Sequence, residues 1–354
     1  MEMVTANIVE ADHAAADANV AAPRAIGAAA GTAELPILDL GPYLAGAPGA
    51  RDALVDELRH IQENIGFYVV VNHGVDRALI EAAYDGLKAF FALPLEDKLA
   101  LRMDENSVGY VPFKSTVYVS SIINQNTKKD LNETLILARE RAADHPAVLA
   151  GRRFTGPNKW PVAVVGFRDA LVAYQRAIEA LGRQVLPLYA LALKKPSDFF
   201  DSCFTDPIMW QRNTYYPPVK GEDNQFGIAP HTDHSFLTLL PIADEPGLQI
   251  LTQDGSWIEP PQGLDNGIVI NTGEFFNRWT NNRFIATPHR VVPPQNDRYS
   301  ITTFFNPDAD TVAAAIDTCV GPNNPAKHDP VTLYEYVCWY IDTNYRRDAG
   351  GRQD

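Results

Sequence analysis

Two side chains that could bind one metal ion are separated by a single residue in the stretch HTDHS. His231 and Asp233 stand just ahead of SFLTLLPI, whose alternation predicts a β-strand. Residues i and i+2 of an extended chain point to the same face, so both side chains can reach the same ion. A third candidate ligand is His289 in ATPHRVV, at the head of another apolar run. We therefore expect a three-residue metal site.

The types of these ligands indicate which metal would bind. Two histidines and one carboxylate on one face form the facial triad of non-haem Fe(II) oxygenases, which leaves coordination positions open for other ligands. A catalytic zinc site could use the same residues, but in a tetrahedral geometry closed to a chelating co-substrate. The three cysteines lie far apart and form no CxxC pair. They predict neither a thiolate zinc site nor a disulfide framework, and they fit a reducing compartment.

A second group of residues could hold a carboxylate. In the stretch RYS, Arg298 and Ser300 share one face of a predicted strand. A guanidinium binds a carboxylate through two parallel hydrogen bonds, and an arginine inside a barrel is costly to bury without such a partner. Tyr216, at the end of NTYYP, could donate a third hydrogen bond from a facing strand. These residues predict a site for a small molecule that carries a carboxylate.

Other residues have less specific surroundings. His73 in VNHGV lies on a different element from the candidate ligands, which favours a structural role. His234 follows Asp233 directly and should point to the opposite face, where it packs or supports the ligands from behind. Glu274, after NTG, could support the ligands from behind or lie at the surface, and the surface position is favoured. Phe304 shares the face of Arg298 by even spacing and could line the substrate side.

Length and composition are those of an ordinary globular enzyme. The 354 residues are 46% hydrophobic and 21% charged, with a formal net charge of −14. A chain with no basic surplus is a poor partner for nucleic acid or an anionic membrane. No apolar run reaches transmembrane length, and the first residues lack the features of a secretory signal. We expect a cytoplasmic protein, monomeric by default, that acts on a small molecule.

The N-terminal half reads as helices with a few strands. Residues 1–34 are Ala-rich and predict a disordered tail. Residues 106–126 predict an irregular or hairpin segment. The expected elements are a short strand at Leu35–Leu40, a helix in RDALVDELRHIQEN stopped by Gly66, a buried strand in FYVVVNHGV, a helix after the N-cap Asp76, and a long helix at Pro161–Lys195 interrupted at Pro187.

After about Met209 the pattern changes to many short strands separated by turns. The pair Asp254–Gly255 between two apolar runs predicts a hairpin. Such a series is typical of an antiparallel sandwich or barrel, closed here by a final helix at about Pro330–Arg347. The predicted fold class is mainly β with flanking helices. The predicted division is a tail at 1–34, an N-terminal α/β region at 35–200, a β core at 205–310, and a C-terminal helix and tail at 311–354.

The motifs HTD, HRV and RYS, preceded by PILDL and GFYVVVNHGV, resemble the isopenicillin N synthase-like family of Fe(II)/2-oxoglutarate-dependent dioxygenases. DLNETL, PNKWP, GLQI and NTGE extend the likeness over the chain from about residue 35. The resemblance implies a double-stranded β-helix, or jelly roll, with a helical N-terminal region. It also implies matched functional positions: the iron ligands His231, Asp233 and His289, the 2-oxoglutarate-binding pair Arg298 and Ser300, the assisting Tyr216, and Thr214 where many plant members carry an asparagine.

The activity implied by the resemblance uses Fe(II), 2-oxoglutarate and O2. Such an enzyme hydroxylates, desaturates or cyclises a small organic metabolite, often in secondary metabolism, through a ferryl intermediate, and releases succinate and CO2. An isopenicillin N synthase-type oxidase without 2-oxoglutarate is the alternative. There Arg298 and Ser300 would hold a substrate carboxylate, and Gln353 could be an extra iron ligand. A silent binding protein and a zinc hydrolase are the other classes to separate from it.

Overall fold

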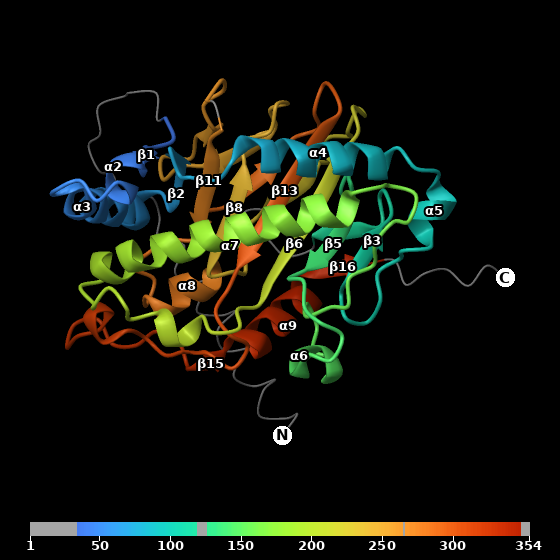
Figure 1. Ribbon diagram of the computed structural model, residues 1–354. Coiled ribbons are helices and arrows are strands. Elements are labelled where there is room, and N and C mark those ends of the chain that lie inside the picture. Colours follow the sequence, from blue (N-terminus) through green and yellow to red (C-terminus); the bar gives the residue numbers. More distant parts are fainter. Residues whose placement is uncertain (1–33, 119–125, 265, 348–354) are drawn as a thin grey trace.

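An eight-stranded sheet and a four-stranded sheet form the centre of the protein in the computed structural model (Figure 1). The structure describes residues 34–118, 126–264 and 266–347. The predicted tail at 1–34, apart from its last residue, and the candidate ligand Gln353 lie outside the described residues. The large sheet has the order β1-β2-β11-β8-β13-β6-β5-β3, and the small sheet has the order β10-β9-β12-β7. All pairs are antiparallel except β1 with β2.

The strands come from all parts of the described chain. Those of the large sheet are β1 (Ile37–Asp39), β2 (Phe67–Val71), β3 (Gly109–Val111), β5 (Glu133–Ala138), β6 (Met209–Tyr216), β8 (Leu237–Pro241), β11 (Ile268–Thr272) and β13 (Arg298–Phe305). Those of the small sheet are β7 (Ile228–His231), β9 (Leu248–Leu251), β10 (Trp257–Ile258) and β12 (His289–Val291). Two further ribbons pair β14 (Val312–Ala313) with β15 (Val331–Thr332), and β4 (Thr116–Tyr118) with β16 (Tyr345–Arg347).

Helices cover the outer face of the large sheet. In Figure 1 the long helices α4 and α7 run across its strands, and both contact β13. The helices are α2 (Gly41–Leu44), α3 (Ala50–Asn64), α4 (Arg77–Phe91), α5 (Leu95–Leu99), α6 (Pro146–Leu149), α7 (Phe167–Ala192), α8 (Glu274–Trp279) and α9 (Leu333–Asn344). Short 3₁₀ turns lie at Asp201–Cys203 and Asp317–Cys319. None of the helices in the described ranges is long and apolar enough to cross a membrane.

Strand alternation decides what faces the interior between the two sheets. On β6, Gln211 faces the helical layer, where its side-chain oxygen accepts a hydrogen bond from Gln175 on α7 at 3.1 Å. Arg212 and Tyr216 belong to the opposite face and line the interior of the sandwich. Because both faces of the sheet are covered, a central strand such as β11 is buried at every position, as its sequence IVINT suggests.

Most predicted elements are confirmed. The main chain of Ala78 donates a 2.9 Å hydrogen bond to the side chain of Asp76, which caps α4 as expected. The predicted hairpin is the β9–β10 pair, in which Trp257 lies opposite Leu251. The segment predicted as irregular or a hairpin contains the short strands β3 and β4, and its residues 119–125 lie outside the described ranges. The mainly β fold class with flanking helices is confirmed.

The long helix differs from the prediction in two ways: it begins later in the chain, and it is not interrupted at the proline. It begins at Phe167, after Gly166 with a left-handed φ of 76°, and it continues through Pro187 without interruption. A proline inside a helix costs roughly 3 kcal/mol because it removes a hydrogen bond and crowds the preceding turn. Buried side chains on both sides of it, such as Val185 and Tyr189, hold this helix on the sheet. That packing offsets the local cost.

The final helix is shorter than predicted. It starts after Thr332, whose side chain and that of Glu335 form a reciprocal capping box, and it ends at Asn344. The next residues, Tyr345–Arg347, are extended and pair with Thr116–Tyr118. The sequence pattern could not show this, because the strand partner is more than two hundred residues earlier in the chain.

Candidate metal centre

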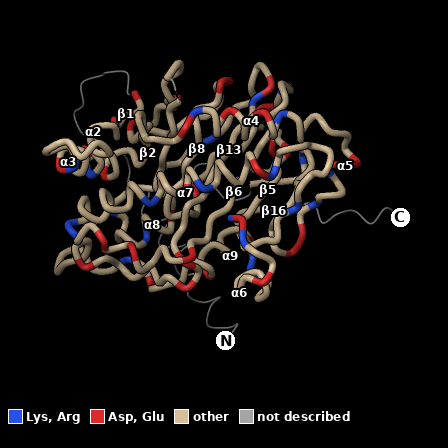
Figure 2. The backbone as a smooth tube through the Cα atoms, in the orientation of Figure 1, with Lys and Arg blue, Asp and Glu red and all other residues tan. Residues whose placement is uncertain are grey.

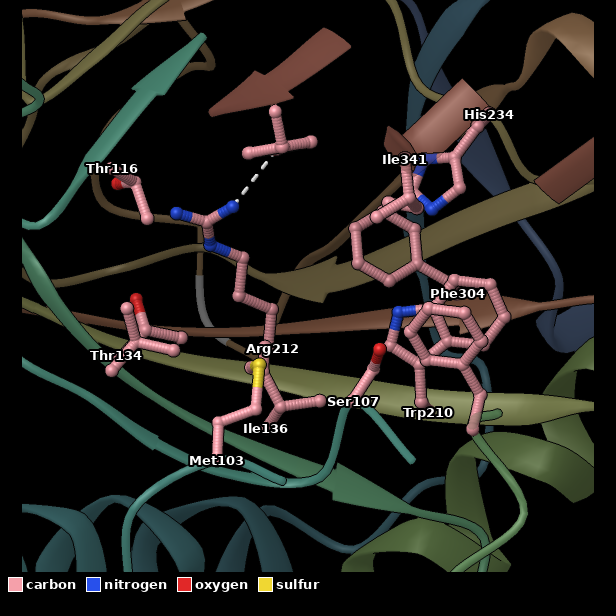
Figure 3. Close-up of a pocket in the computed structure, with 13 residues that line it drawn as sticks. Met103, Ser107, Thr116, Thr134, Ile136, Trp210, Arg212, His234, Phe304 and Ile341 are labelled. Carbon is pink, nitrogen blue, oxygen red and sulfur yellow. Dashed lines mark hydrogen bonds between the residues drawn. The ribbon is translucent and has the colours of Figure 1, made fainter. Parts of the chain in front are cut away.

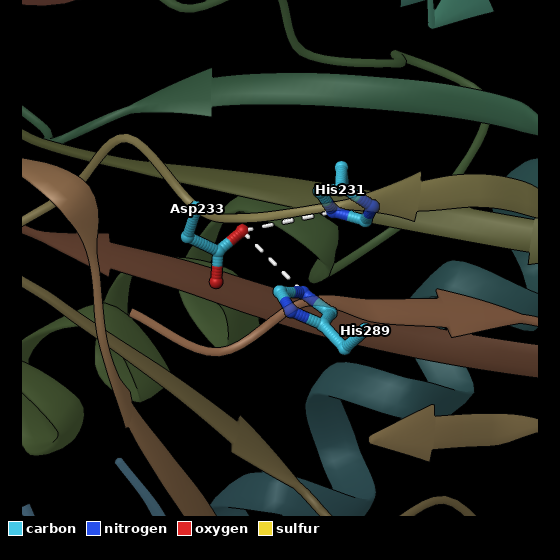
Figure 4. Close-up of side chains that lie close together, drawn as sticks. All are labelled: His231, Asp233 and His289. Atoms are coloured by element: carbon cyan, nitrogen blue, oxygen red, sulfur yellow. Dashed lines mark ion pairs between the residues drawn. The ribbon is translucent and has the colours of Figure 1, made fainter. Parts of the chain in front are cut away.

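The structure brings the three predicted ligands together at one end of the small sheet (Figure 4). His231 ends β7 and His289 begins β12, and the two are direct partners in the antiparallel register. Asp233 follows β7, and its Oδ1 lies 3.8 Å from His231 Nε2 and 3.6 Å from His289 Nε2. One candidate ligand atom from each residue lies within 4.8 Å of the others. Within the described ranges, no other group of three or more His, Cys, Asp or Glu residues is so arranged.

Backbone contacts fix the orientation of both imidazole rings. Nδ1 of His231 lies 2.8 Å from the carbonyl oxygen of Ala229, and Nδ1 of His289 lies 3.1 Å from that of Thr287. A carbonyl only accepts, so each Nδ1 carries the proton and each Nε2 keeps a free lone pair. Those lone pairs face the Asp233 carboxylate, which is the arrangement a shared metal ion requires.

The protonation states also suit a divalent ion. Burial, together with the neighbouring His289, lowers the pKa of His231 to about 3. Burial alone would raise the pKa of Asp233, but the two histidines beside it lower it below its ordinary value. Neutral imidazole and ionised carboxylate are the forms that coordinate a metal. Two nitrogens and one oxygen fit Fe(II) better than Mg²⁺ or Ca²⁺, which prefer oxygen ligands.

An asparagine not predicted from the sequence holds the candidate ligand Asp233 in place. Asn271 on β11 donates a 2.8 Å hydrogen bond from Nδ2 to Asp233 Oδ2, which leaves Oδ1 to face the histidines. Gly273, two residues later, lies so close to the turn that a Cβ there would be 2.1 Å from the backbone oxygen of Ser235. Both residues belong to the motif NTGE, which is the part of the sequence that could have indicated them. The strand that carries Asn271 pairs with β8, which begins directly after residues 232–236, the segment that carries Asp233.

Replacing Asn271 with alanine is expected to weaken Fe(II) binding by about 10- to 100-fold, since partners that orient a metal ligand typically contribute that much. The measurement is an anaerobic competition titration against a chromogenic chelator. Asn213→Ala is the matched control, because Asn213 is also a buried strand asparagine but bonds to the backbone of Leu135, away from the metal ligands. Equal Fe(II) affinity of the two variants would contradict the assigned role.

Glu274 is partly buried beneath residues 232–236, the segment that carries Asp233, so the favoured surface position is wrong and the supporting role is the one observed. Its carboxylate accepts hydrogen bonds from the Thr232 hydroxyl and, at 2.7 Å, from Tyr336 on α9. Tyr340, one turn further along α9, donates to the Thr232 carbonyl at 2.6 Å. The backbone of Glu274 donates to the Asp233 carbonyl at 2.7 Å. The supporting role of Glu274 could not be predicted from the sequence, because the two tyrosines lie about sixty residues later in the chain.

Replacing Glu274 with alanine is expected to lower the free energy of unfolding by about 1–3 kcal/mol, because it leaves buried hydroxyl donors without an acceptor. Urea denaturation of the metal-free protein measures this directly. The exposed Glu96 provides the control, since surface substitutions usually change stability by less than about 0.5 kcal/mol. A Glu274→Ala variant as stable as Glu96→Ala would show that the network contributes nothing.

Arg298 and Ser300, the pair predicted to hold a carboxylate and called the clamp from here on, lie on β13. Arg298 is only 3% exposed, and its guanidinium lies 5.0 Å from the ring centre of Tyr216, its partner in the register. Its Nε donates to the carbonyl of Glu245 at 3.1 Å, but its Nη1 is buried without a hydrogen-bond partner. Among the described residues, no carboxylate lies within the 4.0 Å of an ion pair with it. A buried, unneutralised guanidinium is costly, so this site suits an anionic ligand.

One cavity joins the clamp to the metal site. Its polar lining includes all three candidate ligands together with Arg298, Ser300 and Tyr216, and Phe304 lines it as predicted. The rest of its lining is half apolar, with Phe67, Ile228, Leu240, Leu248 and Val291, and half polar, with Arg212, Thr238, Asn271, Thr302 and Tyr345. Thr214 lies opposite Ser300 in the register but is not among the lining residues, and its hydroxyl lies 3.3 Å from that of Thr134.

The two other histidines considered from the sequence take no part in the triad. His73 lies 2.6 Å from the carbonyl of Asn266 and accepts a 3.1 Å hydrogen bond from the backbone of Val75, which confirms a structural role. His234 turns away from the triad, and its ring stacks on Tyr340 with centroids 5.1 Å apart.

Comparisons with known proteins agree with this geometry. Residues 35–163 match the family model of the N-terminal region of non-haem dioxygenases in morphine synthesis, and residues 207–307 match that of the 2OG-Fe(II) oxygenase superfamily. The 2-oxoglutarate-Fe(II) type oxidoreductase hxnY of Emericella nidulans is 33% identical over 88% of this chain and 90% of its own. The chain belongs to the Fe(II)/2-oxoglutarate-dependent dioxygenase family.

Other members of the dioxygenase family support the same assignment. The 2-oxoglutarate-dependent dioxygenase citB of Monascus ruber is 31% identical over 88% of this chain and 95% of its own. A 2OG-Fe(II) oxygenase family protein from Caulobacter crescentus superposes with a TM-score of 0.75 at 30% identity, covering 88% and 99% of the two chains. A full-length Neurospora crassa protein, solved in complex with alpha-KG, gives a TM-score of 0.75 at 26% identity over 87% and 96%.

Membership of this dioxygenase family settles the general function. The core is a jelly roll, the cofactor is Fe(II), and 2-oxoglutarate and O2 are co-substrates. The enzyme oxidises a small organic molecule. The alternative of an oxidase that does without 2-oxoglutarate is not favoured, because its relatives are 2-oxoglutarate-dependent enzymes.

Proposed function

We propose that His231, Asp233 and His289 hold the Fe(II) ion, and that Arg298 and Ser300 hold the distal carboxylate of 2-oxoglutarate. The observation that carries this proposal is the unpartnered Nη1 of Arg298, buried on the wall of the cavity that contains the three ligands. A carboxylate there would neutralise the guanidinium and make charge-assisted hydrogen bonds.

Each side chain has a distinct part in this proposal. His231, Asp233 and His289 would hold an Fe(II) ion that supplies O2 activation, with electrons from 2-oxoglutarate. The triad leaves positions open for the co-substrate because it offers three ligands on one side. Arg298 and Ser300 orient the co-substrate from its far end, and Tyr216 adds a hydroxyl beside them. The apolar walls exclude water around the reacting groups.

Several finer assignments belong to the same proposal. Thr214 takes the place of an asparagine near the co-substrate and acts through its neighbour Ser300. The division of the chain is 35–200, 205–310 and 311–354, supported by family matches at 35–163 and 207–307. The enzyme works as a cytoplasmic monomer. Acidic and basic residues are interspersed along the described chain (Figure 2), and the net charge of −14 suits no nucleic-acid partner.

The test is an anaerobic absorption titration of the metal-free protein with Fe(II) and then with 2-oxoglutarate. A weak visible charge-transfer band that requires both additions supports chelation of the metal by the co-substrate. Iron binding without that band would leave Arg298 and Ser300 for a substrate carboxylate instead. Failure to bind iron would overturn the assignment of the three ligands.

A further inference from the structure

A second arginine lies on the same interior face as the clamp. The strand register pairs Tyr216 with Arg298, Thr214 with Ser300, Arg212 with Thr302, and Trp210 with Phe304. The first two pairs belong to the co-substrate clamp. The next two continue along the strands, and Arg212 lies four residues from Tyr216, or about 13 Å along β6. Along this face the clamp is therefore followed first by a second cationic side chain, Arg212, and then by the aromatic pair Trp210 and Phe304.

Arg212, Trp210 and Phe304 of these last pairs line a second cavity, shown in Figure 3. Its polar side chains include Arg212 and His234, and its walls are mostly apolar, among them Met103, Ile136, Phe154, Trp210, Phe304 and Ile341. Three of its lining residues, Arg212, Phe304 and Tyr345, also line the cavity of the metal ligands. A molecule held by these shared residues would lie directly against the candidate metal site.

Arg212 is incompletely neutralised. Its Nη1 donates to the Tyr345 hydroxyl at 2.9 Å, its Nη2 reaches Asn132 Oδ1 only at 3.5 Å, and its Nε is buried without a partner. No carboxylate in the described ranges pairs with it within 4.0 Å. Its buried neighbour Asp130 interacts with it electrostatically, and burial raises the pKa of that carboxyl to about 7. A buried guanidinium in this state suits an anionic ligand.

The surroundings of Arg212 are aromatic and flat. The ring centroids of Trp210 and Phe304 are 5.3 Å apart. The ring of Phe154 stacks on that of Trp210 with centroids 4.4 Å apart. His234 lies 4.9 Å from Phe304, and its Nε2 is buried without a hydrogen-bond partner. Rings of this kind favour contact with another planar ring, and the free imidazole nitrogen offers one further polar contact.

We propose that this cavity binds the substrate, and that the substrate is a small aromatic molecule bearing one carboxylate. The carboxylate pairs with Arg212, and the ring lies against Phe304, with a polar ring atom or substituent near His234. This inference rests on the proposed function, because it takes the neighbouring cavity as the iron and 2-oxoglutarate site. It makes Arg212 a specificity-determining residue that is separate from the clamp Arg298.

The test compares three probes of similar size: benzoate, the neutral benzamide, and the non-aromatic cyclohexanecarboxylate. Binding to the protein loaded with Mn(II) and saturating 2-oxoglutarate is measured anaerobically by calorimetry. Benzoate is expected to bind about 10- to 150-fold more tightly than benzamide, the range for a hydrogen bond to a charged group. In Arg212→Gln this preference should disappear, while the dissociation constant of 2-oxoglutarate changes less than about twofold.

Two further variants separate recognition from folding. Tyr345→Phe removes the same hydrogen bond from Arg212 Nη1 but keeps the charge, so it should keep the preference for benzoate over benzamide. Phe304→Leu should reduce the preference for benzoate over cyclohexanecarboxylate, and it keeps the proposal testable if Arg212→Gln does not fold. Arg298→Gln should lose 2-oxoglutarate binding instead.

Three results would overturn the proposal. One is the absence of benzoate binding to the wild type, another is an unchanged preference in Arg212→Gln, and the third is loss of 2-oxoglutarate binding in Arg212→Gln. The last would place Arg212 in the co-substrate site. Normal binding of 2-oxoglutarate without discrimination between the probes would reject only the substrate assignment. Failure of the wild type to bind metal or 2-oxoglutarate would reject the proposed function itself.

Discussion

Replacing His289 with alanine lowers the rate of 2-oxoglutarate-dependent succinate release by more than about 100-fold. Residues that merely orient a metal ligand contribute about 10- to 100-fold to affinity or activity, so loss of a ligand itself should cost more. His289 Nε2 lies 3.6 Å from Asp233 Oδ1, and within the described ranges no other His, Cys, Asp or Glu joins this cluster to replace it. Succinate formation and the bound iron content of the purified variant are the two measurements.

The matched control for this first prediction is His60→Ala. His60 is exposed on α3, where its Nδ1 contacts Asn64, and its loss should leave both measurements unchanged. Removing the metal from the wild type with a chelator should reproduce the His289→Ala defect, and adding Fe(II) back should restore the wild type but not the variant. Full activity of His289→Ala with normal iron content would exclude it as a ligand.

The second large effect is expected at the clamp. Arg298→Ala should raise the dissociation constant of 2-oxoglutarate by about 30- to 4,000-fold, corresponding to roughly 2–5 kcal/mol for truncating one partner of a buried, hydrogen-bonded charge pair. Fe(II) binding should remain within about twofold of the wild type, because none of the three proposed ligands lies on β13. Calorimetry under anaerobic conditions with Mn(II) in place of Fe(II) measures both.

Arg290→Ala is the control for the clamp. Arg290 is the residue after His289, but its guanidinium points outward and lies 3.9 Å from the ring centre of Trp257. Like Arg298 it is an arginine near the candidate metal ligands, but it does not line the cavity that contains them. If both variants bind 2-oxoglutarate as the wild type does, the unpartnered Nη1 of Arg298 serves something other than the co-substrate.

Short-range periodicity explains which parts of the site could be predicted from the sequence. His231 and Asp233, or Arg298 and Ser300, are related by a spacing of two, and the backbone geometry of a strand alone places each pair on one side. Arg212 obeys the same rule with respect to Tyr216, so its position on the interior face was accessible from the sequence as well. Its lack of a carboxylate partner was not, because that depends on every neighbouring strand.

Contacts between distant segments account for what could not be predicted. Asn271 supports Asp233 only because β11 pairs with β8, and Glu274 is partly buried because α9 places Tyr336 against its carboxylate. Pro187 misled the helix prediction for the same reason, since packing of α7 on the sheet outweighs a local rule. Local pattern thus predicts the elements and the ligand pairs, and tertiary packing decides the supporting residues.

The pairing of β16 with β4 affects the order in which the parts of the enzyme become available during synthesis. A ribosome has completed all three proposed metal ligands at His289, and the proposed 2-oxoglutarate-binding pair at Ser300, before it reaches Tyr345. Until that residue emerges, Thr116–Tyr118 has no strand partner, since β4 pairs with β16 alone among the described strands. An unpaired strand edge invites pairing with other chains. The proposed site residues are therefore synthesised before the strand partner of Thr116–Tyr118. The edge of that strand must stay protected until Tyr345–Arg347 has been made.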